Sequence, residues 1–216
     1  MHCEHSGTAG DPGPFFTGFV EGRRGEILDA ALAVFADKGY ECGTMREIAT
    51  RLGVTEPALY RHYAGKEALF ADLVAAAGDH LLGIVAPALE SLAPETLHDS
   101  LLALIDLRRR HLPRGDDVKP VMRTLLTSAP HNAAFRKDFR DHLAGPMIAK
   151  LEAFVPRVDA HFGIVRTREE LTSKVRAFVS LFVGYFMTGV MLDLADDDAA
   201  IVDALYSIMG WSLPED

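Results

Sequence analysis

The chain has 216 residues, of which 49% are hydrophobic and 25% are charged, and its formal net charge is −9 at pH 7. This composition is typical of a globular protein and excludes both a disordered chain and broad electrostatic binding of nucleic acid. Its two cysteines are too few for a disulfide framework, and its first residues lack the pattern of a signal peptide, so we expect a cytoplasmic protein.

Residues 1–20 are rich in glycine and proline and are expected to form a flexible arm. The arm contains His2, Cys3 and His5, a weak cluster of metal-ligating residue types. A metal site needs fixed ligand geometry and supporting hydrogen bonds, which a polar tail does not provide. We therefore predict no metal site, and nothing in the sequence calls for a cofactor.

The first predicted helix lies before Gly39, which follows Lys38 as a helix stop. Its apolar residues recur with helical period, at Ile27, Leu28, Ala31, Val34 and Phe35. This helix would support the elements that follow it.

Thr44 begins the most informative segment, because together with Glu47 it forms the pattern of a capping box. The Thr44 hydroxyl can accept a hydrogen bond from an amide of the first turn, while the Glu47 side chain reaches back to the Thr44 amide. Gly53 then ends the helix, since a residue just past a helix end often takes positive φ, which glycine adopts without strain.

A second short helix is predicted directly after Gly53. Thr55 is its expected N-cap, and Pro57 falls in the first turn, where a missing amide proton has no helical partner. We expect this helix to run from Glu56 to Tyr63 and to turn Leu59 and Tyr63 toward the core. Two short capped helices joined by a tight turn are typical of a helix-turn-helix DNA-binding unit.

The run Leu59-Tyr60-Arg61-His62-Tyr63, followed by Gly65-Lys66-Glu67-Ala68-Leu69, resembles the amino-terminal domain of TetR-type transcriptional repressors. The resemblance covers roughly the first third of the chain, together with the overall length. It implies a repressor that binds a palindromic operator as a homodimer and is released by a small molecule. The expected domains are the arm (1–20), a three-helix DNA-binding domain (21–66) and a larger helical domain for effector binding and dimerisation (67–216).

The resemblance also implies which residues contact DNA. The residues facing the major groove would be Arg46, Glu56, Pro57, Ala58 and Arg61, and those holding phosphates or fixing orientation would be Thr44, Thr55, Tyr60, His62 and Lys66. Arginine can bind guanine O6 and N7 together, and glutamate can accept from cytosine N4. The alternative for the polar members is an ordinary solvated helix face.

Positive charge is concentrated on this unit. Between Thr44 and Lys66 there are four cationic residues and two acidic ones, although the whole chain is acidic. Binding to DNA must therefore be local, and we expect affinity to depend on two such units acting together.

The rest of the chain shows helical patterns and almost no strand signals, which predicts an all-α fold. Expected helices cover 66–86, 95–111, 117–129, 131–155, 168–193 and 198–211, separated in part by Pro87, Pro94, Pro113, Pro130 and Pro156. The longest apolar run, 177–192, is shorter than the roughly twenty residues that span a bilayer, so we expect a buried helix and no membrane association.

This apolar run has no polar face and must be covered on nearly every side. Small residues at Ser180, Gly184 and Thr188 would let a second helix approach closely. The last helix offers an apolar face made of Val202, Leu205, Tyr206 and Met209. Both sets fit either a dimer interface or packing within one subunit, and the resemblance favours a dimer through the last two long helices.

An effector site is expected among the central helices, where aromatic residues could line an apolar cavity and cationic ones could anchor polar groups. The aromatic candidates are Phe135, Phe139, Phe178, Phe182, Tyr185 and Phe186, and the polar ones are Arg108, His111, Arg123 and His142. The alternative is that these aromatics only fill the core.

Two other classes of function stay open at this point. One is an enzyme on an all-helical scaffold, although no phosphate-binding loop, His-x-x-x-His pair or nucleophile elbow occurs, and no catalytic residue is predicted. The other is a nucleoid-associated or protein-interaction module that uses the helix-turn-helix only as a structural corner. Sequence-selective DNA binding would separate the repressor from both.

Overall fold

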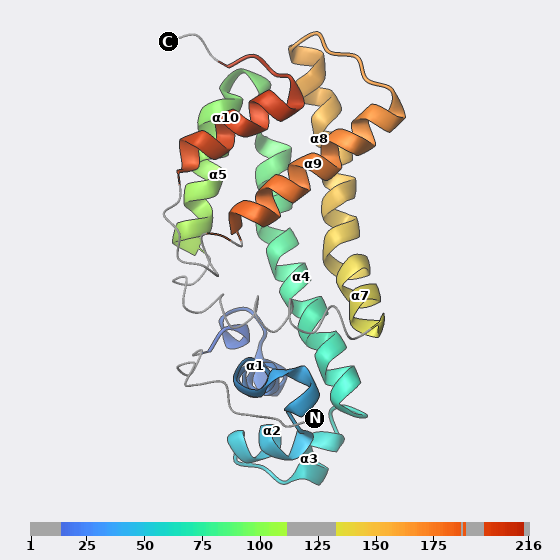
Figure 1. Cartoon of the computed structure of the whole chain (residues 1–216). Coiled ribbons are helices and arrows are strands. Elements are labelled where there is room, and N and C mark those ends of the chain that lie inside the picture. Colours follow the sequence, from blue (N-terminus) through green and yellow to red (C-terminus); the bar gives the residue numbers. More distant parts are fainter. Residues whose placement is uncertain (1–13, 112–132, 187, 189–196, 214–216) are drawn as a thin grey trace. The chain divides into compact units, whose positions relative to one another are not determined.

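The computed structural model describes residues 14–111, 133–186, 188 and 197–213. These residues form an all-α fold in which no strand occurs (Figure 1). Its α-helices are α1 (Gly22–Cys42), α2 (Met45–Arg51), α3 (Glu56–Tyr60), α4 (Lys66–Ser91), α5 (Leu97–His111), α7 (Ala133–Phe139), α8 (Gly145–His161), α9 (Arg168–Phe186) and α10 (Asp198–Met209). The all-α prediction is confirmed. The helix expected at 117–129 lies outside the described residues.

The chain divides into two compact units, and it passes from one to the other after Leu81, between α5 and α7, and after Leu143. The first unit contains α1, α2, α3, the amino-terminal part of α4, and α7. The second contains the remainder of α4, together with α5, α8, α9 and α10. Each unit has its own cluster of buried apolar side chains.

The core of the first unit explains why α1 forms where the sequence predicted it. Ile27, Leu28 and Phe35 are almost fully buried, and they pack with Leu59 of α3 and Leu69 of α4. α1 is interrupted at Gly39, whose φ of 77° lies in the left-handed region. One more turn follows, so the helix ends at Cys42 rather than at Lys38.

Residues 15–20 correct the prediction of an arm that is flexible throughout its length. Phe16 is fully buried beside α1, and the backbone amides of Phe15 and Thr17 donate to the Asp29 carboxylate over 2.8 and 3.0 Å. The Phe19 ring stacks on His80 of α4 with ring centroids 3.7 Å apart. The sequence gave no local sign of these contacts, because their partners are more than ten residues away.

Two prolines that were expected to separate helices lie inside them. Pro87 is within α4 and Pro156 is within α8. A proline in a helix leaves one carbonyl without its amide partner. These carbonyls belong to Gly83, which is exposed, and to Glu152, which is half-buried, so water can bind them and the helices continue to Ser91 and His161.

The helix expected at 131–155 is divided. A π-helical segment, Arg140–Ala144, separates α7 from α8, and Pro146 lies in the first turn of α8. A Cβ placed on Gly78 of α4 would lie 2.8 Å from the His142 carbonyl oxygen, so only glycine allows this close approach. α10 is close to its prediction, with Asp197 as N-cap and Gly210 at a φ of 75° after its end.

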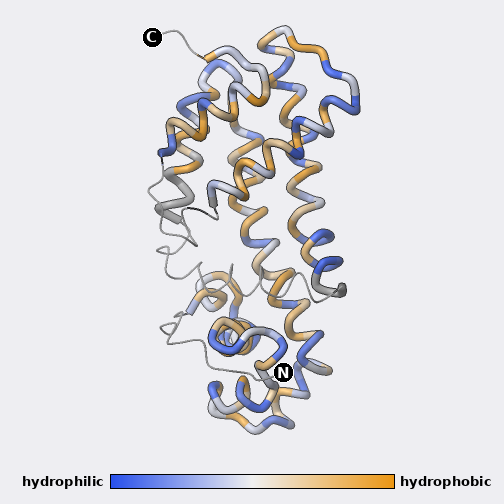
Figure 2. Tube along the Cα trace, viewed as in Figure 1, coloured by the Kyte–Doolittle hydropathy of each residue, from blue (hydrophilic) through white to orange (hydrophobic). Residues whose placement is uncertain are grey.

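α4 carries apolar residues along most of its length (Figure 2). By length and composition alone it is the one described helix that could cross a membrane. Leu69, Phe70 and Leu73 are buried in the core of the first unit, and a core helix passes the same test. This is weak grounds for a membrane span.

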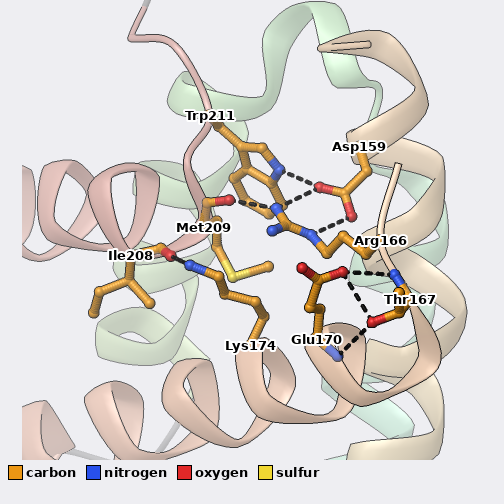
Figure 3. Close-up of polar contacts among 8 residues, drawn as sticks. All are labelled: Asp159, Arg166, Thr167, Glu170, Lys174, Ile208, Met209 and Trp211. Carbon is orange, nitrogen blue, oxygen red and sulfur yellow. Dashed lines mark hydrogen bonds and ion pairs between the residues drawn. The ribbon is translucent and has the colours of Figure 1, made fainter. Parts of the chain in front are cut away.

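A buried polar cluster joins three segments of the second unit, and we call it the Asp159 cluster (Figure 3). Asp159 is buried, and its carboxylate accepts two hydrogen bonds from Arg166 over 2.7 and 2.8 Å and one from the Trp211 indole over 2.8 Å. Arg166 also donates to the Met209 carbonyl, and Lys174 donates to the Ile208 carbonyl. Both cations therefore lie at the carboxyl end of α10, where the helix dipole favours positive charge.

Candidate DNA-binding site

The reading unit, Thr44–Tyr63, contains α2, a tight turn and α3. The predicted capping box is present: the Thr44 hydroxyl accepts from the Glu47 amide over 3.2 Å, and the Glu47 carboxylate accepts from the Thr44 amide over 3.0 Å. Lys38 of α1 also donates to Glu47. Hydrogen bonds from Lys38 and then from Thr44 hold the pKa of Glu47 below its ordinary value.

The turn after α2 forms as the sequence predicted. Gly53 has a φ of 67°, and the Val54 amide donates to the Ala49 carbonyl over 3.0 Å. Val54 packs against the core of the first unit. The Val54 bond gives a partner to a carbonyl at the end of α2 that would otherwise lack one. Together with the Gly53 turn, it fixes the direction in which α3 begins.

α3 is shorter than expected. It starts after Thr55 with Pro57 in its first turn, but it ends at Tyr60 rather than Tyr63, and Thr55 makes no side-chain capping bond. Leu59 is buried and Tyr63 is half-buried, as predicted. Arg61 and His62 therefore lie in the turn that follows the helix.

The residues expected to contact DNA lie at or near the surface of this unit. The exposed members are Thr44, Arg46, Thr55, Pro57, Tyr60, Arg61 and His62, and the half-buried ones are Glu56, Ala58 and Lys66. Tyr60 has 48% of its surface exposed, and among the described side chains it is the one aromatic residue with such exposure. The unit thus presents polar, cationic and aromatic groups of the kinds that bind phosphates and base edges.

Lys66 differs from the others because its ammonium group is already bound. It donates to the Tyr40 carbonyl over 2.8 Å and to the Glu41 carbonyl over 3.1 Å, and it lies 4.5 Å from the centre of the Tyr40 ring. Lys66 is the first residue of α4, as the sequence predicted.

A second group of contacts, which the sequence analysis missed, holds the end of the reading unit. The Asp72 carboxylate of α4 accepts two hydrogen bonds from Arg24 of α1, over 2.9 and 2.6 Å, and one from the Tyr63 hydroxyl over 2.6 Å. These bonds lower the pKa of Asp72, with Arg24 as the largest cause, and burial raises the pKa of Tyr63. Arg24 and Asp72 are 48 residues apart, so no local spacing reveals the pair.

The structure separates the two sets of residues expected at a dimer interface. Ser180, Gly184 and Thr188 are exposed, and nothing lies within 4 Å of a Cβ placed on Gly184. The α10 set is buried in the core of its own unit and is not available to a partner; it consists of Val202, Leu205, Tyr206 and Met209. That part of the interface prediction is corrected, since the apolar face of α10 packs within the subunit.

The residues expected to bind an effector do not form one group in the described structure. Phe178 and Tyr185 are buried in the second unit, and Phe178 stacks on Phe182 with ring centroids 5.2 Å apart. Phe139 packs against the core of the first unit, and His142 is exposed. Outside the described side chains lie Arg108, His111, Arg123, Phe135 and Phe186. A surface hollow is lined by other residues, all on α9: Arg168, Glu169, Thr172, Ser173 and Arg176.

This architecture defines an all-helical protein with an amino-terminal helix-turn-helix unit. Residues 27–73 match the family model described as bacterial regulatory proteins, tetR family. The HTH-type transcriptional activator FasR of Mycolicibacterium smegmatis is 42% identical over 69 residues, which cover 32% of each protein. The HTH-type transcriptional repressor KstR2 of Mycobacterium tuberculosis is 42% identical over 57 residues, or 26% of this chain and 28% of that protein.

The fold similarity extends further than the sequence similarity. The transcriptional regulator FadR from Bacillus subtilis, solved in complex with stearoyl-CoA, has a TM-score of 0.66 and 16% identity over 85% of this chain and 96% of that one. The amino-terminal segment of the chain, residues 27–73, is therefore similar to the tetR family of bacterial regulatory proteins. Its sequence match spans about a third of the length of the curated relatives, and the likeness beyond that segment is one of fold alone.

Proposed function

We propose that this chain is a transcriptional regulator that binds a palindromic operator as a homodimer and releases it when a small molecule binds. The observation that carries the proposal is the reading unit. Its capping box, Gly53 turn and short α3 lie within the segment that matches the family model. Its relatives include both an activator and a repressor, so either direction of control fits the similarity. We propose repression.

The proposed DNA contacts are the exposed and half-buried residues of the reading unit. Arg46, Glu56, Pro57, Ala58 and Arg61 would face the major groove, where arginine and glutamate can distinguish base pairs. Thr44, Thr55, Tyr60 and His62 would bind phosphates or fix orientation. Four cationic and two acidic residues lie between Thr44 and Lys66. One of the two acidic side chains, Glu47, is paired with Lys38 outside this segment, so its negative charge offsets less of the positive potential of the reading unit.

The proposed dimer contact is the outer face of α9, made of Ser173, Arg176, Ser180, Val183 and Gly184. All five are exposed in the single chain, and Val183 has 51% of its surface exposed. Small residues allow two helix backbones to approach closely, and a two-fold axis lets the same face serve both subunits. α10 would support this face from within its own subunit, since its apolar side chains are buried there.

The proposed effector is a small, largely apolar molecule that binds in the helical domain. FadR, which shares the fold, was solved with stearoyl-CoA, so long-chain acyl compounds are the first probes to test. A ligand that favours the non-binding form by about 1.4 kcal/mol shifts the two-state balance tenfold. Operator DNA must then weaken ligand binding by the same factor by which the ligand weakens operator binding.

The proposal places the protein in the cytoplasm with its DNA and assigns it no catalytic role, because its relatives are transcriptional regulators. Selection of bound duplexes from a random library by the purified full chain tests it. We expect enrichment of a palindrome whose half-sites are about one helical turn apart or somewhat more. Arg46→Ala should change the base preference, while Lys150→Ala, on the exposed surface of α8, should not. Enrichment of no sequence would contradict the proposal.

A further inference from the structure

The carboxyl end of α1 has carbonyl groups that no basic residue of the same turn can bind. Gly39 breaks the helix, and the last turn, Tyr40–Cys42, contains no basic residue. Carbonyl groups in a last helical turn lack amide partners and carry the negative end of the helix dipole. A cation there is stabilising, and it has to come from elsewhere in the chain.

Lys66 supplies that cation from the first residue of α4. Its ammonium binds the Tyr40 and Glu41 carbonyls, 26 and 25 residues earlier in the chain, and lies over the Tyr40 ring. Tyr40 is 6% exposed as a residue, and its ring packs in the core with Phe35 and Phe70, so the binding position is held by buried groups. The Lys66 side chain is therefore held at its backbone by α4 and at its ammonium group by α1.

This contact joins the two helices, α1 and α4, that flank the reading unit in the chain. α1 ends two residues before Thr44, where the reading unit begins, and α4 begins three residues after Tyr63, where the reading unit ends. Fastening Lys66 to Tyr40 and Glu41 therefore brings the two ends of the reading unit together. Two of the three ammonium protons are donated within the protein.

We propose that Lys66 is a positioning residue for operator binding: it holds α2 and α3 in register by joining the start of α4 to the end of α1. Of the two roles that the sequence left open for Lys66, holding a phosphate or fixing orientation, the contacts favour the second. This inference rests on the proposed DNA-binding function. It makes a different prediction about salt, because only a residue that neutralises a phosphate releases a counterion on binding.

The test is the salt dependence of operator affinity for the wild type, Lys66→Met and Lys66→Arg, with Lys150→Met as the control for loss of a surface charge. We expect Lys66→Met to lose about tenfold or more in affinity, the factor for one charge-assisted hydrogen bond, while the slope of log affinity against log salt stays unchanged. Lys66→Arg should not restore affinity, because a planar guanidinium has a different reach and geometry.

A second measurement does not depend on DNA. Amide hydrogen exchange at Gly43, which donates to the Gly39 carbonyl, and across α2 should be about tenfold faster in Lys66→Met and unchanged in Lys150→Met. A slope that falls by about 0.9 for each Lys66, or about 1.8 per dimer, overturns the proposal and makes Lys66 a phosphate contact. Unchanged exchange in Lys66→Met also overturns it. A wild type that selects no DNA refutes the proposed function instead, and the exchange result then decides whether Lys66 holds the unit.

Discussion

The reading unit and the Asp159 cluster use polar bonds in different ways. In the reading unit, the capping bonds join residues three to five positions apart, at the protein surface. In the Asp159 cluster, a carboxylate with 5% of its side chain exposed binds Trp211, which is 52 residues away. The first arrangement leaves several polar side chains of a small unit exposed, whereas the second fixes the carboxyl end of α10 against α8 and α9. The two regions should therefore respond very differently to the loss of one polar group.

The largest expected effect is at the Asp159 cluster. Asp159→Ala leaves the Arg166 guanidinium, with 11% of its side chain exposed, without its carboxylate. Removing one partner of a buried ion pair typically costs about 3–5 kcal/mol. Trp211 is the single tryptophan of the chain, so urea unfolding followed by its fluorescence reports on this region. Glu90→Ala, which breaks an exposed pair with Lys150, should reduce the free energy of unfolding far less; an equal loss in both variants would contradict the comparison.

The next effect concerns assembly rather than folding. Gly184→Leu should leave the subunit folded, because the space around Gly184 is open within the chain. In a dimer through the α9 outer face the added side chain clashes on both subunits, and overpacking costs about 1–3 kcal/mol at each. Sedimentation should show dimerisation weakened by several orders of magnitude at the upper end.

Gly83→Leu is the matched control, since this α4 glycine also has open space around it. It should dimerise as tightly as the wild type. A monomeric wild type at micromolar concentration, or a Gly184→Leu variant that dimerises normally, would place the interface elsewhere.

A smaller effect compares the two threonines that begin the reading helices. Thr44→Ala removes a capping box and should cost about 1 kcal/mol, within the usual range of 0.5–2. Thr55 makes no side-chain capping bond, so Thr55→Ala should change the free energy of unfolding much less. Urea unfolding followed by circular dichroism measures both. Equal costs would mean that Thr55 caps α3 in solution.

The smallest effect is a dependence on pH. Because Lys38 and Thr44 lower the pKa of Glu47 in the folded protein, this group stabilises the fold fully above its ordinary pKa of 4.5. The stabilisation is lost as pH falls through the lowered, folded-state value. Glu47→Gln should therefore show a weaker loss of stability below pH 4.5 than the wild type, as measured by thermal unfolding across that range. Parallel curves for the two proteins would show that the carboxylate makes no such contribution.

Much of the reading unit could be predicted because its signals are local. Thr44, Glu47 and Gly53 act on amides and carbonyls within a few residues, and each forms the contact expected of it. α3 ended early because the sequence signal for its start, at Thr55 and Pro57, is stronger than any signal for its end. Pro87 and Pro156 were misread because a proline's cost depends on whether the carbonyl it leaves open meets water.

The sequence by itself determined the helical class, the order of the helices and the location of the reading unit, since helical period and capping act over short stretches of chain. Only the tertiary structure decided which faces are covered. The sequence pattern of the apolar face of α10 is the same for a face that packs inside the subunit and for one that packs against a partner. In the structure its side chains are buried inside the subunit. Likewise, the partners of Lys66, Asp72 and Asp159 became visible only in three dimensions, because charge pairing at a distance of many residues depends on the packing of the helices that carry the charges.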